Sequence, residues 1–263
     1  MATIYDRTRT SDHRFFVITA YIMAGIIVAG FGMQWLMGRS SFRSPPMLHI
    51  HAVVFMGWTI LYVVQNHLVG RGSVAVHRRL GWIGAGWAVA VVILGLYMTA
   101  MMVRQGRTPF FFQPGYFLVM NWLTVLGFGA LTAVAIRLRR RTDWHRRLML
   151  CGMAILTGPA FGRLLPMPLL IPFAAWGVTL CVMLLPIAGM IADIRRYGTI
   201  HRAWWWGAGT IAALQLAIGI VAFSPFGLTV YRAVTAGAAG ETVAPLAFPP
   251  FPAARPPGTP PGR

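Results

Sequence analysis

The stretch HRRLGWIGAGWAVAVVILGLYMTAMMV, residues 77–103, decides the fold of this chain. A histidine-arginine pair stands directly before an apolar run that is long enough to cross a bilayer as a helix, which takes ~20 residues. The same order recurs at His13, His145 and His201, so that consecutive pairs lie 64, 68 and 56 residues apart. Each interval fits two spans with their loops, and one further apolar run lies within it. The pattern therefore predicts a polytopic membrane protein built from helical hairpins.

The composition excludes several classes of protein. Hydrophobic residues make up 57% of the chain and charged residues 11%, with a mean hydropathy of +0.65, which leaves too little polar surface for a soluble domain. All 23 basic residues are arginine, against five acidic residues, for a net charge of +18. The arginines stand between apolar runs, so the expected partner is a bilayer with anionic headgroups and not nucleic acid. A chain without lysine cannot form a retinal Schiff base, which excludes a rhodopsin.

The predicted fold class is an all-α membrane protein, a bundle of about seven transmembrane helices over residues 15–226. The predicted spans are 15–38, 47–70, 80–103, 115–136, 147–166, 168–192 and 203–224. The fifth contains Pro159 and Arg163, which predicts a helix that is kinked or short and ends near the far surface.

The two ends of the chain are expected on opposite sides of the membrane. Fifteen arginines lie on the side of the N-terminus and six on the other side before the far tail. The positive-inside rule then makes residues 1–14 a cytoplasmic N-terminus and places the C-terminus in the periplasm of a bacterial inner membrane. The chain is expected to be loop-like from about residue 227. From Pro245 onward eight prolines favour disorder, so 227–263 is predicted to be a Pro/Gly/Ala-rich disordered tail.

The histidines allow two interpretations. In the first, the His-Arg pairs are interfacial anchors that fix the orientation; Asp12, Asp143 and Thr199 are then the expected N-caps upstream of three of the pairs. In the second, some histidines bind a cofactor, haem b or a metal ion, because imidazole is the commonest metal ligand.

The cofactor interpretation has three candidate binding residues. His67 lies at the inner end of the second span, while His77 and His145 begin two other helices at the same depth. No catalytic residue is predicted, because the chain has no Ser-His-Asp order, no Gly-rich phosphate loop and no His-Glu-x-x-His motif.

A family resemblance rests on short motifs within residues 45–165. They are Leu48-His49-x-His51-Ala52, Trp58, Gln65, His77-Arg-Arg-Leu-Gly81 and His145-Arg-Arg-Leu-Met149. Together they resemble a group of uncharacterised bacterial multi-pass inner-membrane proteins. That group is similar to membrane proteins of cytochrome oxidase assembly and, more remotely, to b-type diheme membrane cytochromes.

Two functional hypotheses follow. The first is an integral inner-membrane protein that binds haem or a metal near the cytoplasmic face, in a respiratory or assembly role with a partner in a membrane complex. The alternative is a non-redox structural or small-solute transport protein whose histidines are anchors only.

Overall fold

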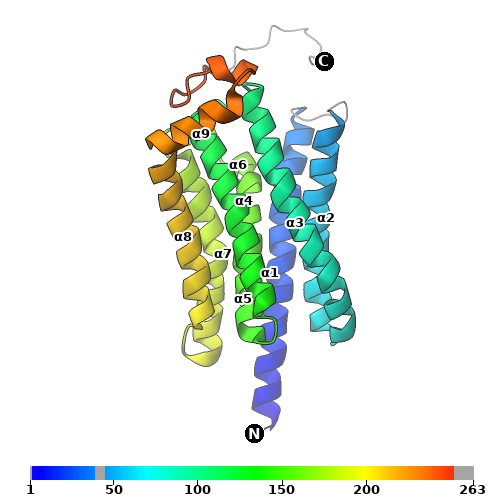
Figure 1. Ribbon diagram of the computed structural model, residues 1–263. Helices are drawn as coiled ribbons and strands as arrows, with labels where there is room; N and C mark the ends of the chain where they lie inside the picture. The colour runs from blue at the N-terminus through cyan, green and yellow to red at the C-terminus, as the bar shows by residue number, and fades with distance from the viewer. Residues whose placement is uncertain (1, 39–44, 252–263) are drawn as a thin grey trace.

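The computed structural model describes residues 2–38 and 45–251 of the chain, with side chains from residue 12 onward. The described part is helical and contains no strand. Its elements are α1 (Ala2–Leu36), α2 (Pro46–Gly70), α3 (Val74–Arg104), α4 (Pro114–Arg137), α5 (Thr142–Leu156), α6 (Gly158–Leu164), η1 (Met167–Leu170), α7 (Ala174–Tyr197), α8 (Arg202–Ala222), α9 (Pro225–Thr235) and η2 (Ala239–Thr242). Figure 1 shows long helices side by side, with α9 lying across one end of the bundle.

The prediction of an all-α membrane bundle is confirmed. Six helices in the described part are long and apolar enough to cross a membrane: α1 from Asp12 onward, α2, α3, α4, α7 and α8. The fifth span, predicted to be kinked or short, is broken into α5 and α6, which meet at Thr157. Pro159 causes the break, because it has no amide hydrogen to give to the carbonyl of Ile155 one turn earlier.

Helix α5 lies inside the bundle. Helices α1, α2, α3, α4, α8 and α7 follow one another around the molecule, each in contact with the next, and α5 contacts α1, α4, α7 and α8. Arg147, Leu148 and residues 150–155 of α5 are all buried. Gly207 of α8 permits the close approach, since a Cβ there would lie 2.3 Å from the sulfur of Cys151. A helix enclosed in this way contacts protein and not lipid, so it can be short and carry charge.

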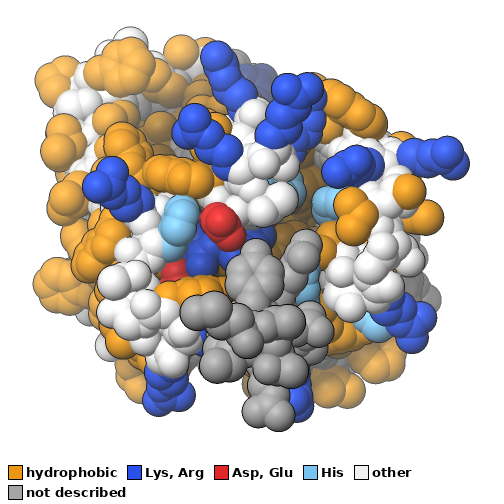
Figure 2. Space-filling model, turned by 90° about the horizontal axis from the view of Figure 1, so that it is seen from below, with side chains coloured by type: hydrophobic (Ala, Val, Ile, Leu, Met, Phe, Trp, Pro, Cys, Tyr) orange, Lys and Arg blue, Asp and Glu red, His pale blue; other side chains and the backbone are white. Residues whose placement is uncertain are grey.

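Successive spans alternate in direction, as the hairpin pattern predicts. The connections at 71–73, 138–141 and 198–201 lie at the same end of the bundle as the N-terminus, and this end is called the basic end below. Helix α9 and the last described residues lie at the opposite end (Figure 1). Seen from the basic end, Figure 2 shows arginines spread around the rim, with histidines and acidic side chains nearer the middle.

The structure differs from the expected tail over residues 227–251. Ser224 caps α9 by accepting a hydrogen bond from the amide of Gly227 at 3.1 Å, and the hydroxyl of buried Tyr231 donates to the carbonyl of Gly240 at 3.1 Å. Further along, Pro245 accepts a hydrogen bond at 2.8 Å from the amide of Gly115 in the first turn of α4. Proline cannot donate but keeps its carbonyl, so a proline-rich segment can cap the N-terminus of a helix. The rest of the predicted tail, 252–263, lies outside the described residues.

Candidate functional site

Two of the three candidate histidines meet at the basic end. His77 lies in the first turn of α3 and His145 in the first turn of α5. Their ring centroids are 6.3 Å apart and their planes are inclined by 77°. The two residues are far apart in sequence, and it is the return of every second loop to the basic end that brings them together.

His145 is fixed by a backbone acceptor. Its Nδ1 lies 2.8 Å from the carbonyl oxygen of Ala135 in the last turn of α4. Carbonyls in the last turn of a helix lack an intrahelical donor, so the ring satisfies one of them by donating from Nδ1. A neutral imidazole that donates from Nδ1 keeps the lone pair of Nε2 for another partner.

His77 is held by an amide side chain. Gln65 of α2 lies 2.7 Å from Nδ1 of His77. In the orientation that satisfies all its neighbours, the Gln65 nitrogen donates to this Nδ1 and to the His77 carbonyl, while its oxygen accepts from the amide of Gly81 at 3.0 Å. Rotated by half a turn, the amide would turn its oxygen toward the His77 carbonyl and its nitrogen toward the Gly81 amide, so that neither end would find a partner. Gln65 therefore favours the neutral tautomer of His77 that carries its proton on Nε2.

The distance between the two ring centroids, 6.3 Å, is compatible with two imidazoles on opposite sides of one metal ion. Imidazole nitrogens bind such ions at ~2 Å, which places the centres of two opposed rings ~6 Å apart. Metal-binding histidines also usually engage the second ring nitrogen with a neighbouring acceptor, as His145 does. No group of three or more histidine, cysteine or acidic side chains suited to a metal occurs in the part of the chain that the structure describes. The donor set is thus a pair of histidines, which suits a macrocycle-bound ion better than a bare one.

His67, the third candidate, lies in the last turn of α2. It follows Gln65 by two residues, and side chains two apart on a helix point ~200° away from each other. Because Gln65 faces α3, the ring of His67 is directed away from His77. Its side chain is partly buried.

Next to the pair, a buried ion pair anchors the centre of the bundle. Arg147 of α5 donates to both carboxylate oxygens of Asp193 of α7, from Nε at 3.0 Å and from Nη2 at 2.7 Å. Asp193 also accepts from the indole of Trp204 at 2.9 Å and from the amide of His201 at 3.2 Å. Arg147 and Asp193 are each 2% exposed. A buried charge pair of this kind is tolerated only when such additional hydrogen bonds satisfy it.

A second carboxylate joins the first helix to the same group. Asp12 of α1, 2% exposed, forms a salt bridge with Arg146 of α5 and another, at 3.4 Å, with Arg196 of α7. Arg146 also pairs with Asp143 in its own helix. Three of the five acidic residues of the chain therefore lie in one network that joins α1, α5, α7 and α8 beside His145.

Sequence reasoning missed this network because it assigned Asp12 and Asp143 to helix starts. In the structure α1 runs without interruption through Asp12, and α5 begins at Thr142. Helix α8 is capped by His201, not Thr199, and Nδ1 of His201 accepts from the amide of Ala203 at 3.1 Å. Burial lowers the pKa of His201, and the charge of Arg147 acts in the same direction, which favours the neutral ring that this cap requires. One feature of the sequence could have indicated the network. The chain has only five acidic residues against 23 arginines, so a carboxylate next to an arginine-rich loop is expected to form salt bridges.

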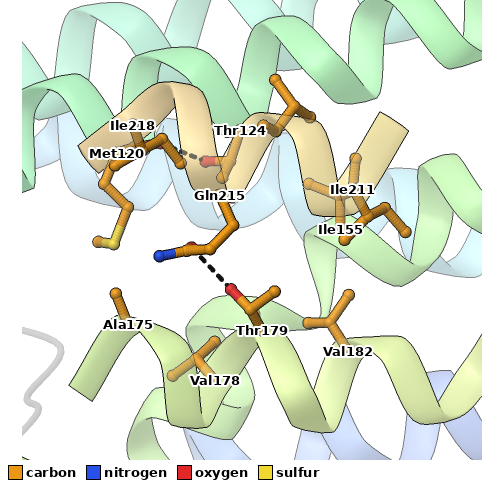
Figure 3. Close-up of a pocket in the computed structure, with 12 residues that line it drawn as sticks. Met120, Thr124, Ile155, Ala175, Val178, Thr179, Val182, Ile211, Gln215 and Ile218 are labelled. Atoms are coloured by element: carbon orange, nitrogen blue, oxygen red, sulfur yellow. Dashed lines mark hydrogen bonds between the residues drawn. The ribbon is translucent and has the colours of Figure 1, made fainter. Parts of the chain in front are cut away.

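A small cavity lies on the other side of the helix break. Its volume is about 60 Å³, room for a few water molecules at ~10–15 Å³ each. Ile155 and Gly158, which flank the break, help to line it. Figure 3 shows Gln215 of α8 reaching toward Thr179 of α7, whose hydroxyl donates to the Gln215 oxygen at 2.8 Å. The remaining walls are mostly apolar.

Comparisons with known protein families, with curated proteins and with solved structures gave no match for this chain.

Proposed function

We propose that this integral membrane protein binds haem at its basic end, where His77 and His145 would hold it. The observation that carries the proposal is the approach of the two rings to 6.3 Å between centroids. A porphyrin supplies four nitrogens to its iron, so two protein ligands suffice, whereas a bare ion would need more donors than the pair offers.

The surroundings of the pair suit such a group. Haem carries two carboxylates at neutral pH, and Arg78 and Arg79 follow His77 directly, on the end of the bundle where most arginines lie. In the network of Asp12, Arg146, Arg147 and Asp193, the charges of the aspartates and arginines balance one another. Arg78 and Arg79 are not needed to neutralise these aspartates and can bind other anions.

Bound haem would supply one-electron chemistry. The protein itself would position the ring of His145 through the carbonyl of Ala135 and the ring of His77 through the side chain of Gln65. We further propose a respiratory or assembly role in a bacterial inner membrane, with the basic end in the cytoplasm. The excess of arginine at that end supports the orientation.

A reduced-minus-oxidised visible spectrum with iron analysis, on protein purified in detergent, tests the proposal. Wild-type protein should show a Soret band and close to one iron per chain, and His77→Ala and His145→Ala should each lose both. His67→Ala is the matched control, since its ring is directed away from the pair, and it should keep the spectrum. Loss of haem in His67→Ala would add this residue to the ligands. Wild-type protein that binds neither haem nor metal in haem-replete cells would end the proposal and favour a role of the histidines as anchors.

A further inference from the structure

Arg163 of α6 lies at membrane depth near the opposite end of the bundle. Its guanidinium stands over the ring of Phe31 in α1, 4.2 Å from the ring centroid. Phe31 is five residues from the end of α1, so at 1.5 Å per residue the site lies ~7–8 Å inside the end of that helix. This is about the boundary between headgroups and acyl chains.

The approach of α6 to α1 fixes the arginine at this place. Gly30 of α1 packs directly on α6, since a Cβ there would lie 2.7 Å from the carbonyl oxygen of Ala160. Arg163 follows Ala160 by one turn, so its side chain emerges beside Phe31. The side chain is exposed, and at the depth inferred from α1 it would contact lipid.

The charge of Arg163 has no anionic partner within the described residues. Of its five N–H donors, one is used, by Nη1 donating to the carbonyl of Pro159 at 2.7 Å. The sequence contains no acidic residue from 13 to 142 or from 144 to 192, so no neighbouring loop can supply a carboxylate. Asp12, Asp143 and Asp193 lie at the basic end, and Glu241 accepts a hydrogen bond from the amide of Gly237.

One nitrogen of His51, at the same end of the bundle, lacks a hydrogen-bond partner. His51 of α2 is five residues from the start of that helix, as Phe31 is five residues from the end of α1. It is within electrostatic range of Arg163, and its Nδ1 is buried without a hydrogen-bond partner in the described part of the chain. Three helices thus bring an exposed cation, an aromatic ring and a buried imidazole nitrogen without a hydrogen-bond partner to the same end of the bundle.

We propose that Arg163 and His51 form a binding site for a phosphate group, supplied by the headgroup of a lipid in the leaflet at this end. Phosphate fits because it accepts several charge-assisted hydrogen bonds from one guanidinium. A lipid fits because Arg163 is exposed at the depth where its side chain can extend to the headgroup layer while its stem stays on apolar surface.

Native mass spectrometry of the full chain with phosphatidylglycerol tests this site. We expect the wild-type protein to retain lipid, and Arg163→Gln to bind it about tenfold more weakly, as the loss of one charge-assisted contact implies. His51→Ala should show a smaller loss. Arg232→Gln is the matched control, because Arg232 is an exposed arginine of α9 at the same end, and it should bind lipid like the wild type.

Two further measurements distinguish a lipid phosphate from free phosphate, and a loss of binding from a failure to fold. Inorganic phosphate should not displace the lipid at millimolar concentration; displacement would assign the site to free phosphate and overturn the lipid assignment. Arg163→Lys keeps the charge and helix content, so it should retain part of the lipid even if Arg163→Gln does not fold. Equal lipid retention by Arg163→Gln and the wild type, or an equal loss in Arg232→Gln, would overturn the proposal.

Discussion

At the scale of single residues, Gln65 donates to Nδ1 of His77 and so favours the tautomer that carries its proton on Nε2. Glutamate at this position can only accept a hydrogen bond, so Gln65→Glu should fix the proton on Nδ1 and free Nε2. We expect tighter haem retention in Gln65→Glu and a 10–100-fold loss of affinity, in order of magnitude, in Gln65→Leu. Haem transfer to an acceptor protein would measure both. Equal retention in the two variants would show that Gln65 does not act on the site.

Arg147 makes a second prediction at this scale. Arg147→Met leaves Asp193 as an uncompensated buried charge, so we expect the free energy of unfolding to fall by ~3–5 kcal/mol. Denaturation in detergent would measure this, with Arg140→Met, a change at an exposed arginine of the same end, as the silent control. Adding Asp193→Leu should restore only part of the loss, because Trp204 and the amide of His201 then lose their acceptor. An unchanged free energy of unfolding in Arg147→Met would contradict a structural role of the Arg147–Asp193 pair.

Residue spacing predicted part of the candidate site. The His-Arg register placed His77 and His145 at one depth, and the structure brings these two rings together. Residue spacing could not show that Gln65 faces α3 and that His67 is thereby directed away from His77. The rotation of an apolar helix about its axis depends on the helices packed around it. The aspartate network was hidden for the same reason, because Asp12 and Arg196 meet only through tertiary packing.

At the scale of helices, α5 shows where sequence reasoning ends. Pro159 predicted an interruption of the fifth span, and in the structure the helix is broken two residues earlier, at Thr157. The central position of α5 was not predictable, because protein-facing and lipid-facing surfaces are both apolar in a membrane. Helix α9 was missed because its buried face is made of Gly227, Tyr231 and Thr235, a pattern too polar and too short to stand out.

The close contact between α5 and α8 gives a prediction at this scale. In Gly207→Ala the new Cβ would meet the sulfur of Cys151, so we expect a loss of ~1–3 kcal/mol in the free energy of unfolding. Gly209→Ala on the same helix meets no atom within 4 Å and should be neutral or slightly stabilising. Removing the sulfur with Cys151→Ala should rescue part of the Gly207→Ala loss in the double variant. Strict additivity of the two changes would argue against the contact.

At the scale of the whole molecule, the C-terminal segment packs against the end of the helical bundle as far as residue 251 and is not a free tail there. A chain ending at residue 236 loses Gly240, Pro245 and Leu246, the acceptors for Tyr231, the Gly115 amide and Gln113. We expect this truncation to lower the thermal unfolding temperature in detergent, whereas removal of 252–263 alone should leave it unchanged. An unchanged unfolding temperature in the shorter chain would mean that these contacts contribute little.

The distribution of charge predicts the orientation of the whole bundle. The loop 138–141 carries three arginines at the basic end, and α9 with Arg232 lies at the opposite end. Translocation of several arginines is disfavoured, so a reporter fused after Arg141 should be cytoplasmic and one fused after Arg232 periplasmic. Three spans separate the two positions, because α5 and α6 together cross the bundle once before α7 and α8. Reversal at both positions would invert the orientation, and the same location for both would mean that the broken α5–α6 pair does not act as a span.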